Sequence, residues 1–169
     1  MAGPGRIVQL SVSPGGVPKR AIAEARVTRL GLEGDGHRDP EHHGGPERAV
    51  CLFASEAIRA LAAEGHAITP GVIGENVTTE GVDWSRVAPA TYLRLGEHVL
   101  LQVTRYTSPC LTIAPVFIGR EFSRVSQKRH PGWSRVYARV LLEGWLRPGD
   151  EVRIVSELEA AELGAVAEP

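Results

Sequence analysis

Glycine and proline divide this chain into short apolar segments, and that division limits the fold more than any other feature. The sequence holds 19 glycines and 12 prolines among its 169 residues. Many of the runs between them alternate in polarity or are rich in β-branched residues, as is typical of β-strands. Strands are expected over residues 6–13, 21–30, 49–53, 75–79, 91–95, 98–104, 137–142 and 150–155. Many short strands with glycine and proline turns predict a mainly β barrel with a few peripheral helices.

Helices are expected at only a few places. Residues 56–64 have helical spacing of their apolar positions, with Ser55 as N-cap and Gly65 as the stop. Residues 115–128 are predicted to form a second helix, and residues 82–87 a single helical turn. The strands at 91–95 and 98–104 are expected to pair as a hairpin, and the strands at 137–142 and 150–155 to form a last pair.

The size and charge of the chain exclude several classes of function. Residues 1–169 are expected to form a single domain, with its core at about 6–155 and an acidic tail at 156–169 that either docks as a helix or frays. A net charge of −1 gives no reason to expect nucleic acid or an anionic membrane as partner. No apolar run approaches the ~20 residues of a membrane span. Two cysteines far apart in sequence indicate a reducing compartment, and we expect a cytoplasmic protein.

The stretch from Leu95 to Cys110 presents one thiol at the end of a strand. Pro109 lacks a backbone N–H and restricts Ser108 to extended geometry, so the chain that leads into Cys110 is held in place. Such a thiol suits a soft metal ligand or a nucleophile, whereas a free cysteine more often fills a core as a small hydrophobic residue. The stretch alone leaves both interpretations open. Cys51 lies in an apolar run and is expected in the core.

A long polar and glycine-rich segment, residues 31–48, is a second functional candidate. Its candidate site residues are Asp35, His37, Asp39, His42 and His43, beside Arg38 and Arg48. This density of polar groups suits an anionic ligand rich in heteroatoms, with paired glycines that let backbone N–H groups approach it. Histidines and carboxylates are also ligands of zinc and iron, although the spacing fits no standard zinc pattern. A solvated loop is the remaining interpretation.

Two smaller groups of residues complete the set of candidates. Glu75 and Asn76 open a strand, and a carboxylate beside an amide can pair with the alternating donors and acceptors of a pterin or purine edge. Their alternative role is to complete a turn. Lys19 and Arg20, just after a glycine turn, can meet a phosphate, although such cations are more often solvated surface residues. Arg105 can lower the pKa of the Cys110 thiol if the strand end bends back.

Taken in order, these segments resemble the MOSC family, the domain also found at the C-terminus of molybdenum cofactor sulfurases. The resemblance spans about residues 6–155. It is carried by Gly34-Asp-Gly-His37, His43-Gly-Gly45, Gly74-Glu-Asn-Val-Thr78 with Gly81-Val-Asp83, Leu95-Gly96, Val103-Thr104, Pro109-Cys110, Tyr137-Ala-Arg-Val140, Gly144 and Gly149-Asp150. It implies a closed, mostly antiparallel β-barrel that binds the molybdenum cofactor, molybdopterin. No region typical of a desulfurase or of an iron–sulfur tail accompanies it, so the chain resembles the stand-alone bacterial form, which takes electrons or sulfur from another protein.

The resemblance also implies roles for individual residues. Cys110 matches the family's functional cysteine and is expected to ligate molybdenum, which accepts soft sulfur donors readily. Glu75 and Asn76 are expected to orient the pterin, and Asp35 and His37 to shape the substrate mouth and take part in catalysis. The remaining cofactor-binding candidates, of which the cations would meet the cofactor phosphate, are Lys19, Arg38, His43, Arg48 and Arg105.

Three functions follow as hypotheses. The first is an oxidoreductase that reduces N-hydroxylated or N-oxygenated small molecules, the substrate class that relatives of this kind imply. The second is a sulfur carrier that holds a persulfide on Cys110 during cofactor maturation. The third and lowest ranked is a metal-dependent hydrolase built on His37, His42 and His43.

Overall fold

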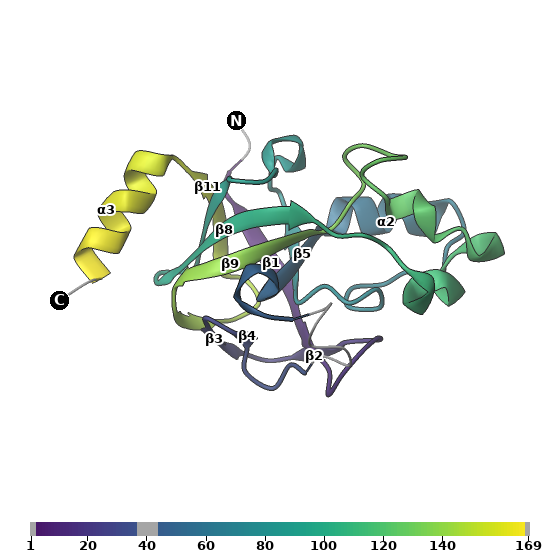
Figure 1. The fold of residues 1–169 in the computed structure, drawn as a ribbon, viewed down its shortest axis with the longest axis horizontal. Coiled ribbons are helices and arrows are strands. Elements are labelled where there is room, and N and C mark those ends of the chain that lie inside the picture. The colour runs from purple at the N-terminus through teal and green to yellow at the C-terminus, as the bar shows by residue number, and fades with distance from the viewer. Residues whose placement is uncertain (1–2, 37–43, 168–169) are drawn as a thin grey trace.

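A closed β-barrel forms the centre of the molecule in the computed structural model, which describes residues 3–36 and 44–167 (Figure 1). Seven strands make up the barrel wall. They are β1 (Gly5–Val12), β5 (Val50–Ala54), β6 (Val77–Glu80), β7 (Tyr92–Leu95), β8 (Val99–Tyr106), β9 (Val136–Leu142) and β11 (Glu151–Val155). They are hydrogen-bonded in the order β11-β7-β8-β9-β5-β6-β1, and β1 pairs again with β11 to close the ring. The predicted closed barrel is confirmed.

The barrel is mixed rather than purely antiparallel, because one pair of its strands runs in parallel. β5 and β6 pair in parallel, with Leu52 opposite Val77. The helix α2 (Ser55–Ala63) leaves β5 and lies between these two strands in sequence. A crossover of this kind is what parallel neighbours require. All other pairings in the barrel are antiparallel, including the predicted β7–β8 hairpin.

Two sequence predictions about strands are wrong. The single strand expected at 21–30 is two strands, β2 (Arg20–Ile22) on the edge of β1 and β3 (Ala25–Thr28) in a separate small sheet. That small sheet has the order β10-β3-β4, with β10 (Gly144–Leu146) and β4 (Gly31–Leu32) at its edges. The strand pair expected from residues 137–142 and 150–155 does not form either. These residues belong to β9 and β11, and the chain between them forms β10, which pairs with β3.

The helix predicted over residues 115–128 is also wrong. The chain from Leu111 to Val125 forms three short 3-10 helices, Leu111–Val116, Ile118–Arg120 and Phe122–Val125. Pro115 lies inside the first, and Gly119 has a φ of 65°, which a right-handed helix does not allow. Further 3-10 turns lie at Pro46–Arg48 and Trp84–Arg86, the second at the predicted helical turn.

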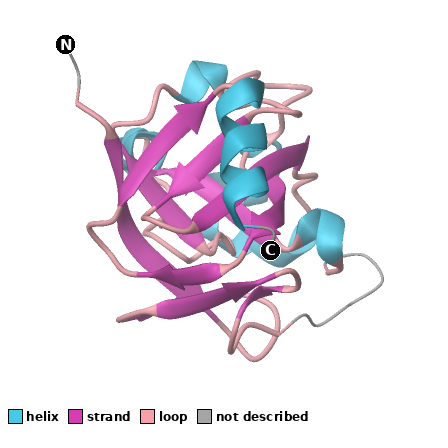
Figure 2. Ribbon diagram, turned by 90° about the vertical axis from the view of Figure 1, so that its left-hand side faces the viewer, coloured by secondary structure: helices cyan, strands magenta, loops and turns pink. Residues whose placement is uncertain are grey.

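The two α-helices differ from expectation only in detail. The N-cap of α2 is Ala54 and not Ser55, and no side chain caps this end. The tail forms α3 (Glu157–Ala167), which lies across the outside of the barrel in Figure 2. Ala160 packs there against Leu100 and Val155. Of the two interpretations of the tail, the docked helix is therefore the one observed. None of the helices in residues 3–36 and 44–167 is long and apolar enough to cross a membrane.

Two hydrophobic clusters, one on each side of β5, define where a site can form. Val50 and Leu52 belong to the large cluster that fills the barrel, whereas Phe53 belongs to a second cluster with α2 and the 3-10 helices. Since successive strand residues point to opposite faces, Cys51 shares the outer face with Phe53. The elements that carry the second cluster, α2 and the 3-10 helices of residues 111–125, lie at the end of the molecule opposite α3 (Figure 1). The outer face of β5 is therefore turned toward these elements.

Candidate functional site

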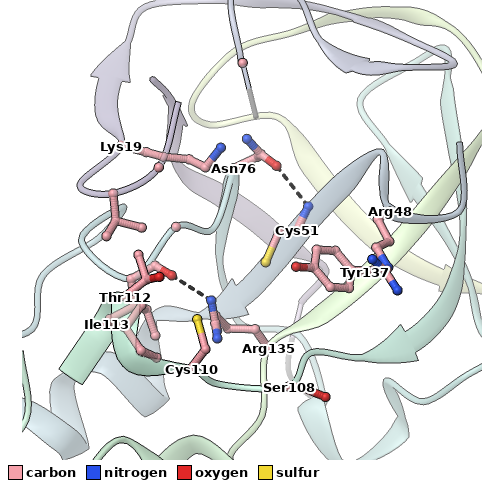
Figure 3. Close-up of a pocket in the computed structure, with 15 residues that line it drawn as sticks. Lys19, Arg48, Cys51, Asn76, Ser108, Cys110, Thr112, Ile113, Arg135 and Tyr137 are labelled. Atoms are coloured by element: carbon pink, nitrogen blue, oxygen red, sulfur yellow. Dashed lines mark hydrogen bonds between the residues drawn. The ribbon is translucent and has the colours of Figure 1, made fainter. Parts of the chain in front are cut away.

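A cavity of about 280 Å³ occupies the space between the outer barrel wall and the loops. Strands β5 and β9 form one wall, and the loops around residues 16–19, 73–76 and 108–113 form the others (Figure 3). Its lining residues are Gly16, Val17, Lys19, Gly36, Arg48, Cys51, Ile73, Gly74, Asn76, Ser108, Cys110, Thr112, Ile113, Arg135 and Tyr137. The volume is at the small end of the range for ligand sites, which suits part of a ligand rather than a large ligand in full.

Cys110 brings a half-buried thiol into this cavity. It lies between β8 and the 3-10 helix Leu111–Val116 in an extended conformation, with φ −140° and ψ 177°. Figure 3 shows its sulfur directed into the cavity. The interpretation of Cys110 as a sealed core residue is therefore wrong, and a thiol that a ligand can reach remains.

A second sulfur, that of Cys51, lines the same cavity. Cys51 is buried as expected, and Asn76 fixes its backbone from both sides. The Cys51 N–H donates to Asn76 Oδ1 at 3.0 Å, and the Asn76 N–H donates to the Cys51 carbonyl at 2.8 Å. Burial raises the pKa of the Cys51 thiol to about 11, so this sulfur stays protonated near neutral pH.

The Asp35 carboxylate anchors one side of the cavity without lining it. Lys19 Nζ donates to both of its oxygens, at 2.6 and 2.7 Å, and Asn76 Nδ2 donates to it at 2.9 Å. The Ser13 backbone N–H donates to it at 3.0 Å. The side chains of Lys19 and Asp35 are only 9% and 3% exposed, so this is a buried ion pair. Asp35 therefore holds two cavity residues in place, and Lys19 keeps a compensating charge beside it.

Arg135 is a cavity residue that the sequence analysis did not identify. It is 7% exposed, and its Nη1 donates to the Ile73 carbonyl at 2.6 Å. Its Nε is buried and has no hydrogen-bond partner within residues 3–36 and 44–167. With Lys19 and Arg48 it gives the cavity three cations, and no acidic residue is among the described residues that line it. The cavity therefore favours an anionic group.

Tyr137 is a second cavity residue that the sequence analysis did not identify as a site residue, although the motif Tyr137-Ala-Arg-Val140 is part of the family resemblance. It lies on β9 directly opposite Cys51, and Arg135 lies two residues earlier on the same face. The alternation of Arg135, Tyr137 and Arg139 with Ser134, Val136 and Ala138 was the available signal, because period two places polar side chains together on one face of a strand.

Glu75 lies behind the cavity wall and not among the described lining residues. It is fully buried, and its Oε2 accepts from Thr78 Oγ1 at 3.4 Å, while Oε1 has no hydrogen-bond partner in the described part of the chain. Burial raises the pKa of this carboxyl to about 7, against the opposing effects of backbone N–H groups and of Arg135. Glu75 is placed to act on Arg135 rather than on a ligand directly.

The remaining predicted residues divide into three groups. Lys19, Arg48, Asn76 and Cys110 come together in the cavity, and Asp35 supports them from behind. Arg105 is exposed on β8 and is not among the described residues of the lining. The other candidates, His37, Arg38, Asp39, His42 and His43, lie outside the described residues. Over the ranges 3–36 and 44–167, no three histidine, cysteine or acidic side chains lie together as a metal site would require.

Comparison with known proteins identifies the family. The family model of the MOSC domain matches residues 39–153, more than half of the chain. The chain belongs to the MOSC domain family. This match covers α2, the cavity strands and Cys110, whereas the lining residues Gly16, Val17, Lys19 and Gly36 precede it. The MOSC family is associated with the molybdenum cofactor.

Two bacterial MOSC relatives are similar over most of the chain. YflK of Bacillus subtilis (strain 168) is 32% identical over 85% of this chain and 65% of its own length. YiiM of Escherichia coli (strain K12) is 31% identical over 94% of this chain and 75% of its own length. This chain therefore spans less than two thirds of YflK, which has sequence that this MOSC chain does not match.

Solved structures support the same assignment. The crystal structure of YiiM from Geobacillus stearothermophilus has a TM-score of 0.69 at 26% identity, over 90% of this chain and 76% of that one. The YUAD protein of Bacillus subtilis, with a TM-score of 0.70 at 17% identity over 89% and 94% of the two chains, shows likeness of fold alone. The MOSC barrel is thus a shared framework on which the cavity residues are arranged.

Proposed function

We propose that this MOSC domain binds the molybdenum cofactor in the cavity, with Cys110 as the ligand of the metal, and reduces N-hydroxylated or N-oxygenated small molecules. The observation that carries the proposal is a reachable thiol at the edge of a cavity whose described lining is cationic and has no carboxylate. Family membership supports the choice of cofactor. The reductase activity rests on the resemblance of the sequence to relatives that carry it out.

The residues of the cavity fit this cofactor by their chemistry. A thiolate is the soft ligand that molybdenum accepts, and Cys110 is the more exposed of the two sulfurs. Arg135, with its unpartnered Nε, and Arg48 would meet the anionic end of the cofactor. Asn76 has both its amide groups committed to Cys51 and to Ser11 and Asp35, so it would shape the wall rather than bind the pterin.

The bound cofactor would supply two-electron oxygen-atom chemistry that no side chain can provide. The chain itself would contribute binding, charge and exclusion of water. Lys19 and Asp35 would stay a closed ion pair, so their net charge contributes little to anion affinity. The positive potential would come from Arg48 and Arg135, which line the cavity on the side of Tyr137. Electrons would reach the site from an external donor protein.

Native purification followed by metal and cofactor analysis tests this proposal. The expected result is molybdenum together with the fluorescence of an oxidised pterin, near one equivalent of each. The main competing hypothesis, a sulfur carrier, is favoured by the reachability of Cys110 alone and predicts cyanide-releasable sulfur on the protein without molybdenum. Stoichiometric zinc would favour the hydrolase. Either of the last two results would contradict the proposal.

A further inference from the structure

The Tyr137 hydroxyl is a polar group of the cavity that the proposed function has not used. Tyr137 pairs directly with Cys51 across β5 and β9, and side chains opposite each other in such a pair share one face of the sheet. That face is the outer wall of the barrel, where the cavity lies. The strand register therefore fixes the ring, and Figure 3 shows its hydroxyl directed into the cavity.

The Tyr137 hydroxyl is also available to a ligand. It has no hydrogen-bond partner among the described residues, in contrast to Asn76, whose amide oxygen and nitrogen are both hydrogen-bonded. Arg48, Arg135 and the thiols of Cys51 and Cys110 all act on it electrostatically. Burial is the largest influence and raises the pKa of the phenol, so the group keeps its proton and acts as a neutral donor.

Cys110 and Tyr137 enter the cavity from different elements. Cys110 comes from the loop that follows β8, whereas Tyr137 comes from β9 in the barrel wall. If the cofactor metal is held by the Cys110 sulfur, a substrate that reacts at this metal lies in the cavity that the Tyr137 phenol also lines. A buried donor without a partner gains a hydrogen bond when a ligand brings an acceptor oxygen within reach of it.

We infer that Tyr137 is a catalytic residue whose hydroxyl donates a hydrogen bond to the N-bound oxygen of the substrate. This inference rests on the proposed function and names the group that distinguishes an N-hydroxylated substrate from its reduced product. In the reduction R–NH–OH + 2 e⁻ + 2 H⁺ → R–NH₂ + H₂O, the N–O bond breaks and the oxygen leaves as water. The two electrons come from the external donor protein and the two protons from solvent. A donor at the departing oxygen favours this cleavage.

Binding of a matched pair of ligands tests the inference without turnover. The probes are adenine and adenine hydroxylated on its exocyclic amine, titrated by calorimetry into the holoprotein with no reductant present. The wild type is expected to prefer the hydroxylated base, and Tyr137→Phe, which removes only the hydroxyl, to lose about fivefold to tenfold of that preference. Affinity for adenine, which has no N-bound oxygen, is expected to stay within about twofold.

Control variants and metal content separate this inference from the proposed function. Tyr92→Phe removes a phenol that packs near α3, away from the cavity, and is expected to keep the wild-type preference. An unchanged preference in Tyr137→Phe, or a wild type that binds both bases equally or neither, overturns the inference. Molybdenum content, measured on the same samples, decides the proposed function independently. Full molybdenum with an unchanged preference in Tyr137→Phe would remove the role of Tyr137 alone.

Discussion

At the scale of single residues, burial decides which groups of the site are reactive. Cys51 and Cys110 line one cavity, yet Cys51 is buried and keeps its proton, whereas Cys110 is only half-buried and can be reached by a ligand. Glu75 is buried without a full set of hydrogen bonds, which costs free energy when it ionises. The motif around Glu75 predicted it at the ligand, whereas the structure has it buried behind the cavity wall.

Replacing Glu75 with glutamine is expected to raise the free energy of unfolding at neutral pH relative to its value at acidic pH, because glutamine does not ionise. Its pKa is about 7 in the folded state against an ordinary 4.5, so its contribution to stability is fully present below pH 4.5 and is lost as the pH rises to 7. That loss is at most about 3 kcal/mol. In urea unfolding at a series of pH values, Glu75→Gln should flatten the decline between pH 4.5 and 7 that the wild type shows.

A matched surface variant controls for the change of net charge. Glu97 has a side chain that is 90% exposed, and Glu97→Gln should leave the decline in place. A Glu75→Gln protein that declines as steeply as the wild type would contradict the assignment of this effect to Glu75.

At the scale of elements, the cavity depends on how loops are fastened to strands. Asp35 joins three segments, since its donors come from the end of β1, from the start of β2 and from the entry to β6. Gly36 lies against the same corner, where its N–H donates to the Ser13 carbonyl at 2.7 Å. A carbon added at Gly36 would lie 2.1 Å from the Pro14 carbonyl oxygen, which explains why glycine is required there.

Breaking the Lys19–Asp35 pair is expected to be costly because both groups are buried. Asp35→Asn should lower the free energy of unfolding by about 3 kcal/mol, since it leaves a buried ammonium group without its anion. The double variant Asp35→Asn/Lys19→Met should lose less than the sum of the single variants. Denaturant unfolding of the three proteins and the wild type measures this coupling.

The surface pair of Arg6 and Glu80 provides the comparison for that cycle. Its side chains are 65% and 31% exposed, and Glu80 also accepts from Arg59, so solvent screens these pairs and Glu80→Gln should cost far less than Asp35→Asn. If Asp35→Asn cost no more than Glu80→Gln, the buried pair would not be an anchor of the cavity.

The elements also show what the sequence could predict. The β7–β8 hairpin was predictable because its strands are neighbours and Gly96, at a φ of 60°, makes the turn. The segment after Cys110 was not, because apolar spacing at Val116, Phe122 and Val125 fits a helix while Pro115 and Gly119 prevent one. The pairing of β11 with β1 and β7 depends on contacts distant in sequence, which a local pattern does not contain.

At the scale of the whole molecule, the barrel interior supplies rigidity and its outer wall supplies the site. One strand, β5, contributes Leu52 to the interior and Cys51 to the cavity, so the same hydrogen-bonded ladder supports both. Family membership, a reachable thiol and a cationic lining together support the proposed cofactor. The order of the motifs predicted the family and singled out Cys110. Arg135 and Tyr137 were not predicted, because their place in the cavity depends on the pairing of β9 with β5.

The most direct measurement is the molybdenum content of Cys110→Ser purified under native conditions beside the wild type. We expect about one equivalent of molybdenum in the wild type and at least a tenfold lower content in Cys110→Ser, because a hydroxyl is a poor substitute for a soft thiolate. Cys51→Ser removes the buried, protonated sulfur, which is not the proposed ligand, and should keep its molybdenum. Circular dichroism should show all three proteins folded. A folded Cys110→Ser protein with the wild-type molybdenum content would contradict the proposal that Cys110 holds the metal.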